Sequence, residues 1–170
     1  MAAEDKDLNQ FHMKKSTAIF IQAVIVLIGV GAAAFLLWEP HVEGRNAHAT
    51  LFDIYFKDPF LAYAYLGSTP FFMALFQAFK LVGHAKGGAG LPPEAPKALR
   101  TIRYCALALI GFVALGEVFI ILSVSDDRAG GVFMGLLVAS GSGLVAAAAA
   151  RLERILPSGE EKRLPRKETE

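Results

Sequence analysis

Long apolar stretches alternate with shorter polar segments along this chain of 170 residues. Four of the stretches run for 20 to 22 residues each, and together they contain a single formal charge, that of Glu117. They are Ala18–Trp38, Phe60–Phe79, Tyr104–Ser125 and Ala129–Ala150. A helix that crosses the roughly 30 Å hydrocarbon core of a bilayer needs about 20 apolar residues. The pattern therefore predicts an all-α polytopic membrane protein, a bundle of four transmembrane helices.

The polar segments frame one membrane domain, residues 16–156, between two polar ends. We expect residues 1–15 to form a loose N-terminus and residues 157–170 a disordered tail. Pro96 suits the first turn of a helix, so the third helix should begin there, ahead of its apolar stretch. The fourth helix should continue past Ala150 until Pro157 stops it.

The first apolar stretch also has features of a signal peptide. Lys14 and Lys15 precede it, and Ala47-His48-Ala49 resembles a cleavage site for small residues. However, the stretch is 21 residues long, the triplet lies nine residues beyond it, and signal peptides have shorter apolar regions. We therefore expect the first span to stay in the mature protein.

The lysines and arginines are distributed unevenly about the predicted spans. Fourteen of the 17 fall in the N-terminal segment, the second connection with its flanks, or the C-terminal segment. The other three are Arg45, Lys57 and Arg128. Because positively charged segments remain on the cytoplasmic side, both termini are predicted to be cytoplasmic, in the cell (inner) membrane.

The overall composition says less about the protein than the distribution of its lysines and arginines does. The mean hydropathy of +0.44 is high for a soluble domain of this length. The net charge of +1 indicates no particular partner, and a single cysteine, Cys105, allows no internal disulfide.

Glu117 is the sharpest candidate for chemistry. It lies about 4 Å from the midplane of its span, counting 1.5 Å per residue. Ser68, Thr69 and Ser140 lie at a similar depth, so the four side chains form a candidate intramembrane polar layer. This layer would serve either as a protonatable site for proton or cation movement, or as neutral hydrogen bonding between helices. No basic residue lies at that depth, which favours the neutral form.

The fourth span carries a small residue at every fourth position. These residues are Gly131, Gly135, Ala139, Gly143 and Ala147. Such a ridge lets another helix backbone approach closely, either within the bundle or in a homo-oligomer, and we favour packing within the bundle.

Other polar groups suggest no enzyme and no cofactor or metal site. His41, Glu43, His48 and Asp53 are donors of types that bind metals, but their spacing matches no compact site, so we expect a solvated loop. The Ser140-Gly141-Ser142-Gly143 segment lacks a histidine or lysine within the spans to act as its base. We therefore predict no catalytic, cofactor-binding or metal-binding residues.

Three segments resemble a known bacterial family. They are residues 97–106 (KALRTIRYCA), residues 125–130 (SDDRAG) and residues 70–75 (PFFMAL). Across residues 16–156 the chain resembles the membrane family catalogued as domain of unknown function 2975. The resemblance implies a small four-span protein of no assigned activity, and members encoded beside a helix-turn-helix regulator suggest a regulatory pair. Glu117 is not part of the resemblance.

Together these features favour an interaction or regulatory protein of the membrane. Its expected partners are the lipid bilayer and either another protein or further copies of itself, without direct binding of nucleic acid. The alternative is a proton- or cation-coupled transport or channel protein that uses Glu117.

Overall fold

A computed structural model describes residues 14–42, 59–85, 91–122 and 128–156 of the chain. These residues form four long α-helices: α2 (Lys15–Val42), α4 (Pro59–Ala85), α5 (Ala95–Leu122) and α6 (Arg128–Ile155). Each contains 27 or 28 residues, about 41 Å of helix at 1.5 Å per residue. The all-helical architecture predicted from the sequence is confirmed. The polar ends, the Asp126-Asp127 turn and most of the 39–59 loop lie outside the described residues.

The helix ends follow local sequence signals. The amide of Ala95 donates to the carbonyl of Pro92 at 2.8 Å, and the amides of Lys97 and Ala98 donate to the carbonyl of Glu94. Pro96 lies in the first turn of α5, as predicted. Amide groups in the first turn have no carbonyl partner within the helix, so the missing amide hydrogen of proline costs no hydrogen bond there. α6 continues to Ile155, also as predicted, and Pro157 follows shortly after it in the sequence.

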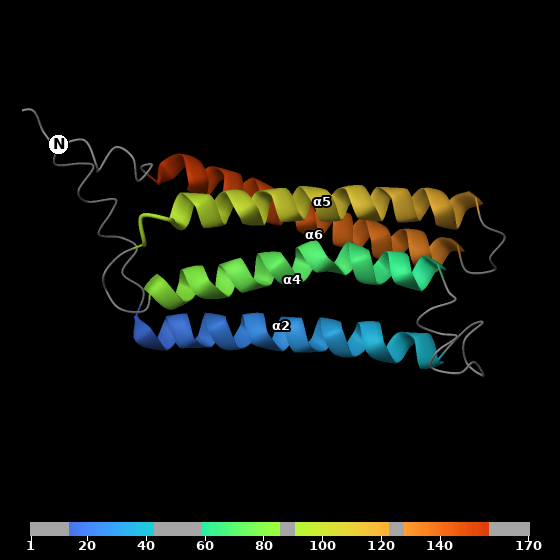
Figure 1. The fold of residues 1–170 in the computed structure, drawn as a ribbon, viewed down its shortest axis with the longest axis horizontal. Helices are drawn as coiled ribbons and strands as arrows, with labels where there is room; N and C mark the ends of the chain where they lie inside the picture. Colours follow the sequence, from blue (N-terminus) through green and yellow to red (C-terminus); the bar gives the residue numbers. More distant parts are fainter. Residues whose placement is uncertain (1–13, 43–58, 86–90, 123–127, 157–170) are drawn as a thin grey trace, which may run out of the picture.

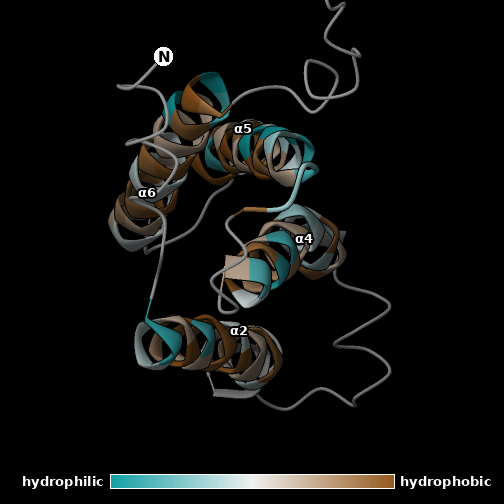
Figure 2. Ribbon diagram, turned by 90° about the vertical axis from the view of Figure 1, so that its left-hand side faces the viewer, coloured by the Kyte–Doolittle hydropathy of each residue, from teal (hydrophilic) through white to brown (hydrophobic). Residues whose placement is uncertain are grey.

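Consecutive helices lie antiparallel and side by side (Figure 1). The contact between α5 and α6 is the most extensive, followed by α4 with α5 and then α2 with α4. Viewed along the helices, the four lie on an open arc with α2 and α6 at its two ends (Figure 2). The first residues of α2 and α5 and the last residues of α4 and α6 meet at one end of the bundle. We call it the basic end because it carries Lys14, Lys15, Lys80, Lys97, Arg100, Arg103, Arg151 and Arg154.

Most of the buried apolar side chains are small, and many large apolar side chains are exposed. The buried apolar residues include Ala95, Ala106, Ala146 and Ala149, whereas side chains such as Leu122 remain 78% exposed. A soluble protein of this size does not expose so much contiguous apolar surface. By length and composition, α2 (over Lys15–Trp38), α5 and α6 (over Ala129–Ile155) are apolar enough to cross a membrane. The exposed apolar surface is therefore the surface expected of a protein in contact with lipid.

Candidate functional site

Glu117 lies between α5 and α6, directly over the backbone of Gly135. A Cβ atom added to Gly135 would overlap Oε1 of Glu117 and lie only 2.7 Å from its Cδ. Gly135 thus provides the space that the carboxyl group occupies. One turn away, the same interface packs Ile120 against Gly131, where an added Cβ would lie 3.2 Å from Cδ1 of Ile120. Because Gly131 and Gly135 have no side chains, the backbone of α6 lies close to α5 there, and the side chain of Glu117 fits between the two helices.

The carboxyl group of Glu117 is not fully paired. Its Oε2 atom is buried and has no hydrogen-bond partner, and no described basic side chain forms an ion pair with it. A buried polar atom without a partner costs about 1–3 kcal/mol. Glu117 is therefore an energetically costly residue between two candidate spans, five residues before the end of α5 at Leu122.

The other members of the predicted polar layer make different contacts. The hydroxyls of Ser68 and Thr69 both donate to the carbonyl of Tyr65, at 2.8 and 3.4 Å, within their own helix. Ser140 is exposed on α6. Among the described residues, no hydrogen bond joins Glu117 to any of these three hydroxyls.

The small-residue ridge of α6 turns gradually away from α5. Gly131 and Gly135 face α5, but a Cβ on Gly143 would meet nothing within 4 Å, and Ala147 is exposed. Four residues of an α-helix correspond to a rotation of about 400°, which is one full turn plus 40°. Each successive residue of the ridge therefore lies about 40° farther around the helix axis than the one before it. The buried residues farther along α6 are instead Ser142, Ala146 and Ala149.

Three hydrogen bonds from side chains to the backbone of another helix were not anticipated from the sequence. The Tyr63 hydroxyl donates to the carbonyl of Phe112 on α5 at 2.6 Å, and the Tyr65 hydroxyl donates to that of Leu36 on α2 at 3.0 Å. Gln22 on α2 donates to the carbonyl of Phe79 on α4 at 3.3 Å. Residues two apart point about 200° apart on a helix, so the two tyrosines reach opposite neighbours. In the sequence, two tyrosines spaced two residues apart in α4 could have indicated that this helix lies between two other helices.

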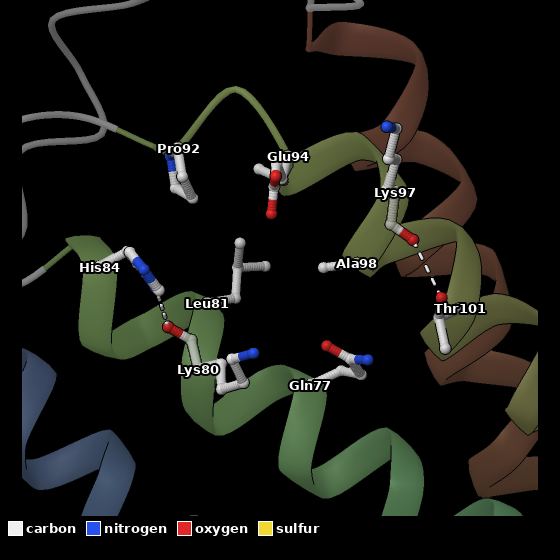
Figure 3. A pocket seen from close by; sticks show the side chains of 10 residues that line it. Gln77, Lys80, Leu81, His84, Pro92, Glu94, Lys97, Ala98 and Thr101 are labelled. Atoms are coloured by element: carbon white, nitrogen blue, oxygen red, sulfur yellow. Dashed lines mark hydrogen bonds between the residues drawn. The ribbon is translucent and has the colours of Figure 1, made fainter.

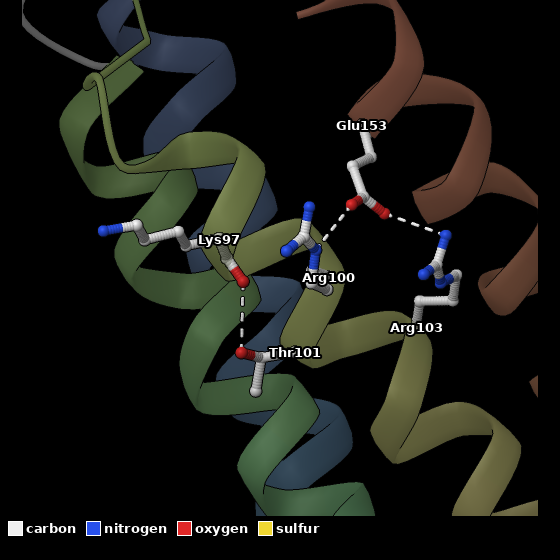
Figure 4. A network of polar contacts seen from close by, with 5 residues as sticks. All are labelled: Lys97, Arg100, Thr101, Arg103 and Glu153. Carbon is white, nitrogen blue, oxygen red and sulfur yellow. Dashed lines mark hydrogen bonds and ion pairs between the residues drawn. The ribbon is translucent and has the colours of Figure 1, made fainter. Parts of the chain in front are cut away.

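Glu153 connects α6 to the beginning of α5 at the basic end. Its Oε1 pairs with Nε of Arg100 at 2.8 Å, and its Oε2 pairs with a terminal guanidinium nitrogen of Arg103 at 3.0 Å (Figure 4). The guanidinium of Arg103 also lies 5.1 Å from the ring centre of Tyr104. One carboxylate thus holds two arginines and joins the two helix ends.

Two hollows lie beside α5, and they differ in polarity. The first, which we call the polar pocket, is at the basic end between α4 and α5 and measures about 380 Å³. The second, which we call the apolar groove, measures about 400 Å³ and is lined by α4, α5 and α6. Its wall includes Phe71, Ala74, Leu109, Val138 and Gly141. The apolar groove suits a hydrocarbon surface, whereas the polar pocket suits a charged group.

Metal binding has no support within the described helices. No group of three histidine, cysteine, aspartate or glutamate side chains gathers there. The side chains of His41, Glu43, His48 and Asp53, which the sequence raised as candidates, lie outside the described part.

Comparison with known proteins identifies the family. The model of the family described as "Protein of unknown function (DUF2975)" matches residues 43–163. The chain belongs to this family. It is also 32% identical over 146 residues to the "Uncharacterized membrane protein YoaS" of Bacillus subtilis (strain 168), a match that covers 85% of this chain and 91% of the relative. No solved structure matches the chain. The resemblance seen in the sequence is thereby confirmed, and the protein is a membrane protein of a family without assigned activity.

The family match begins after α2 and includes α4, α5 and α6. These three helices share the apolar groove and the more extensive helix contacts. α2 is attached through α4, with Gln22 and Tyr65 providing hydrogen bonds between the two helices.

Proposed function

We propose that this DUF2975 protein is a four-span protein of the inner membrane that acts by binding another membrane helix, and not by catalysis. α4 supplies the fourth span in this proposal. It is as long as its neighbours and runs alongside α2 and α5, both apolar enough to cross a membrane. A helix packed lengthwise between two spanning helices would cross with them. The hydroxyls of Tyr63 and Tyr65 in α4 donate hydrogen bonds to backbone carbonyls of α5 and α2, which lowers the free-energy cost of placing these polar groups in a membrane.

The proposed orientation puts the basic end in the cytoplasm. Four spans return the chain to its starting side, so both termini share one compartment. The excess of lysine and arginine at that end supports a cytoplasmic location for it.

The apolar groove is the observation that carries the proposed activity. The arc of helices is open (Figure 2). The groove lies between α4, α5 and α6, and part of its lining consists of small residues such as Ala74, Ala106 and Gly141. Small residues allow close approach of a helix backbone within a membrane. Gln22, Tyr63 and Tyr65 use their polar groups to join neighbouring helices, which also favours a role in contacts over a role in chemistry.

Site-specific photo-cross-linking tests this proposal in the native membrane. A photoreactive residue replaces Leu109 in the apolar groove or, as a control, Leu107, which is exposed on α5 outside the groove. We expect Leu109 alone to yield a protein product of discrete mass. That mass also shows whether the partner is a second copy of the chain.

A filled groove should abolish the product. An added Cβ on Gly141 meets nothing within 4 Å and Gly141 lines the groove, so we expect the larger side chain of Gly141→Leu to occupy the groove. Gly143→Leu is the matched control, because Gly143 has the same open space but does not line the groove. Adducts with lipid alone at Leu109, or a product that persists in Gly141→Leu, would contradict the proposal.

Proton-coupled transport is the second candidate function, and the unpaired Oε2 of Glu117 is the observation that favours it. Glu117→Gln keeps the size of the side chain but removes its titration. Proton flux into proteoliposomes should fall to the background of empty vesicles if Glu117 carries protons. Equal flux with and without the substitution rules this candidate out.

A further inference from the structure

We propose that the polar pocket binds the headgroup of an anionic glycerophospholipid whose headgroup carries free hydroxyls, of the phosphatidylglycerol type. The inference rests on the proposed membrane insertion of α4, which forms one wall of the pocket. Six polar side chains line it: Gln77, Lys80 and His84 from α4, and Glu94, Lys97 and Thr101 from the start of α5 (Figure 3).

Two lysines give the pocket its affinity for a phosphate. Lys80 and Lys97 come from different helices and lie on opposite sides of the group of lining residues (Figure 3). Among the described residues, neither ammonium group pairs with a carboxylate, and that of Lys80 lies 5.5 Å from the ring centre of Phe76. The amide nitrogen of Gln77 adds a neutral donor. Basic pockets between membrane helices at the cytoplasmic side are known to hold anionic lipid headgroups.

The remaining polar groups suit hydroxyls. The Thr101 hydroxyl already donates to the carbonyl of Lys97 at 3.1 Å, so its oxygen is left as an acceptor. Glu94 supplies carboxylate acceptors on the same side. His84 uses Nδ1 at the carbonyl of Lys80, 2.7 Å away, which leaves Nε2 for a ligand. A phosphodiester with a glycerol headgroup offers both the charge for the lysines and the hydroxyl donors for these acceptors.

The surface next to the pocket suits the acyl chains of such a lipid. Met73 precedes Gln77 by one turn, and Leu66 precedes Met73 by two turns, so all three share one face of α4. Leu115 follows Thr101 by fourteen residues, about four turns, on the corresponding face of α5. Leu66, Met73 and Leu115 are all more than half exposed. An apolar strip thus leads away from the pocket along the two helices, which favours a lipid over a small soluble anion.

Native mass spectrometry of the full-length protein in detergent tests the site. The delipidated protein is titrated with short-chain phosphatidylglycerol, with phosphatidylcholine of the same chain length, and with glycerol phosphate. We expect one tightly bound phosphatidylglycerol, weaker phosphatidylcholine, and no glycerol phosphate at the same concentrations. Equal binding of glycerol phosphate would make the site one for soluble anions, and equal binding of the two lipids would overturn the charge argument.

Matched double substitutions locate the effect. Lys80→Gln with Lys97→Gln should weaken phosphatidylglycerol binding by about tenfold to thirtyfold, the loss expected for two basic contacts with an anionic lipid. Lys14→Gln with Lys15→Gln removes the same charge at the same end but outside the pocket, and should change binding less than about twofold. Equal losses in the two double variants would overturn the proposal.

Two further variants keep the test informative. Lys80→Arg with Lys97→Arg retains the charge and should retain binding, which separates loss of charge from loss of structure. Thr101→Val should reduce the preference for phosphatidylglycerol over phosphatidic acid, and an unchanged preference would overturn the assignment of the hydroxyls. These titrations measure lipid binding to the protein in detergent. Their outcome therefore does not depend on the number of helices that cross the membrane, which a separate experiment on membrane topology measures.

Discussion

The contact between Glu117 and Gly135 makes a strong prediction for Gly135→Ala. Alanine is normally the better residue in a helix, by about 0.8–1.0 kcal/mol over glycine. Here, however, the new Cβ would overlap Oε1 of Glu117 and lie 2.7 Å from its Cδ and 3.3 Å from its Cγ. The carboxyl group of Glu117 must therefore move out of the space that it occupies over Gly135.

The expected magnitude follows from these two opposing effects. Overpacking an interface costs about 1–3 kcal/mol, against which the helix preference of alanine returns up to about 1 kcal/mol. We expect Gly135→Ala to lower the free energy of unfolding by up to about 2 kcal/mol. Gly141→Ala is the control, because its Cβ would meet nothing within 4 Å and should only stabilise the helix.

Unfolding by SDS titration in mixed micelles measures these differences. In a Glu117→Ala background the overlap is absent, so Gly135→Ala should become stabilising, with a coupling free energy of about 1–3 kcal/mol between the two positions. Glu117→Gln keeps the shape of the side chain, so it should leave Gly135→Ala destabilising. The reasoning is refuted if Gly135→Ala stabilises the protein as much as Gly141→Ala does, or if Glu117→Ala leaves its effect unchanged.

Two further predictions concern the contacts between helices. Tyr63→Phe removes the 2.6 Å hydrogen bond to the carbonyl of Phe112 and should lower the free energy of unfolding by about 0.5–1.5 kcal/mol in the same titration; no change would show that the bond contributes nothing. Glu153→Gln removes the charge that holds Arg100 and Arg103, so it should destabilise the protein at low ionic strength and less so in molar salt. A loss independent of salt would contradict an ionic role for Glu153.

The apolar runs were sufficient to predict the helices and their order. Membrane-length helices form their backbone hydrogen bonds internally, so a run of 20 or more apolar residues determines the element without knowledge of its neighbours. Local signals also predicted ends, as Pro96 did for the beginning of α5. The sequence did not reveal that the helices form an open arc, because that arrangement depends on which faces pack together.

The sequence did not determine how each helix is rotated about its own axis, and this rotation decides which side chains meet in the candidate site. Glu117 and Gly135 were each singled out, one as a midplane acid and the other as part of a small-residue ridge, but their contact depends on the relative rotation of α5 and α6. The polar pocket combines residues from two helices and was missed for the same reason. The tyrosine pair in α4 was the overlooked signal, since Tyr63 and Tyr65 point to opposite neighbours.

The central claim is that all four helices cross the membrane and that both termini are cytoplasmic. Fusions of a reporter that fluoresces only in the cytoplasm, and of one active only outside it, are compared at the N-terminus and the C-terminus of the full-length chain. Four spans predict that the cytoplasmic reporter works at both termini and the external reporter at neither. Three spans, with α4 outside the bilayer, would put the termini on opposite sides, and that result would contradict the account.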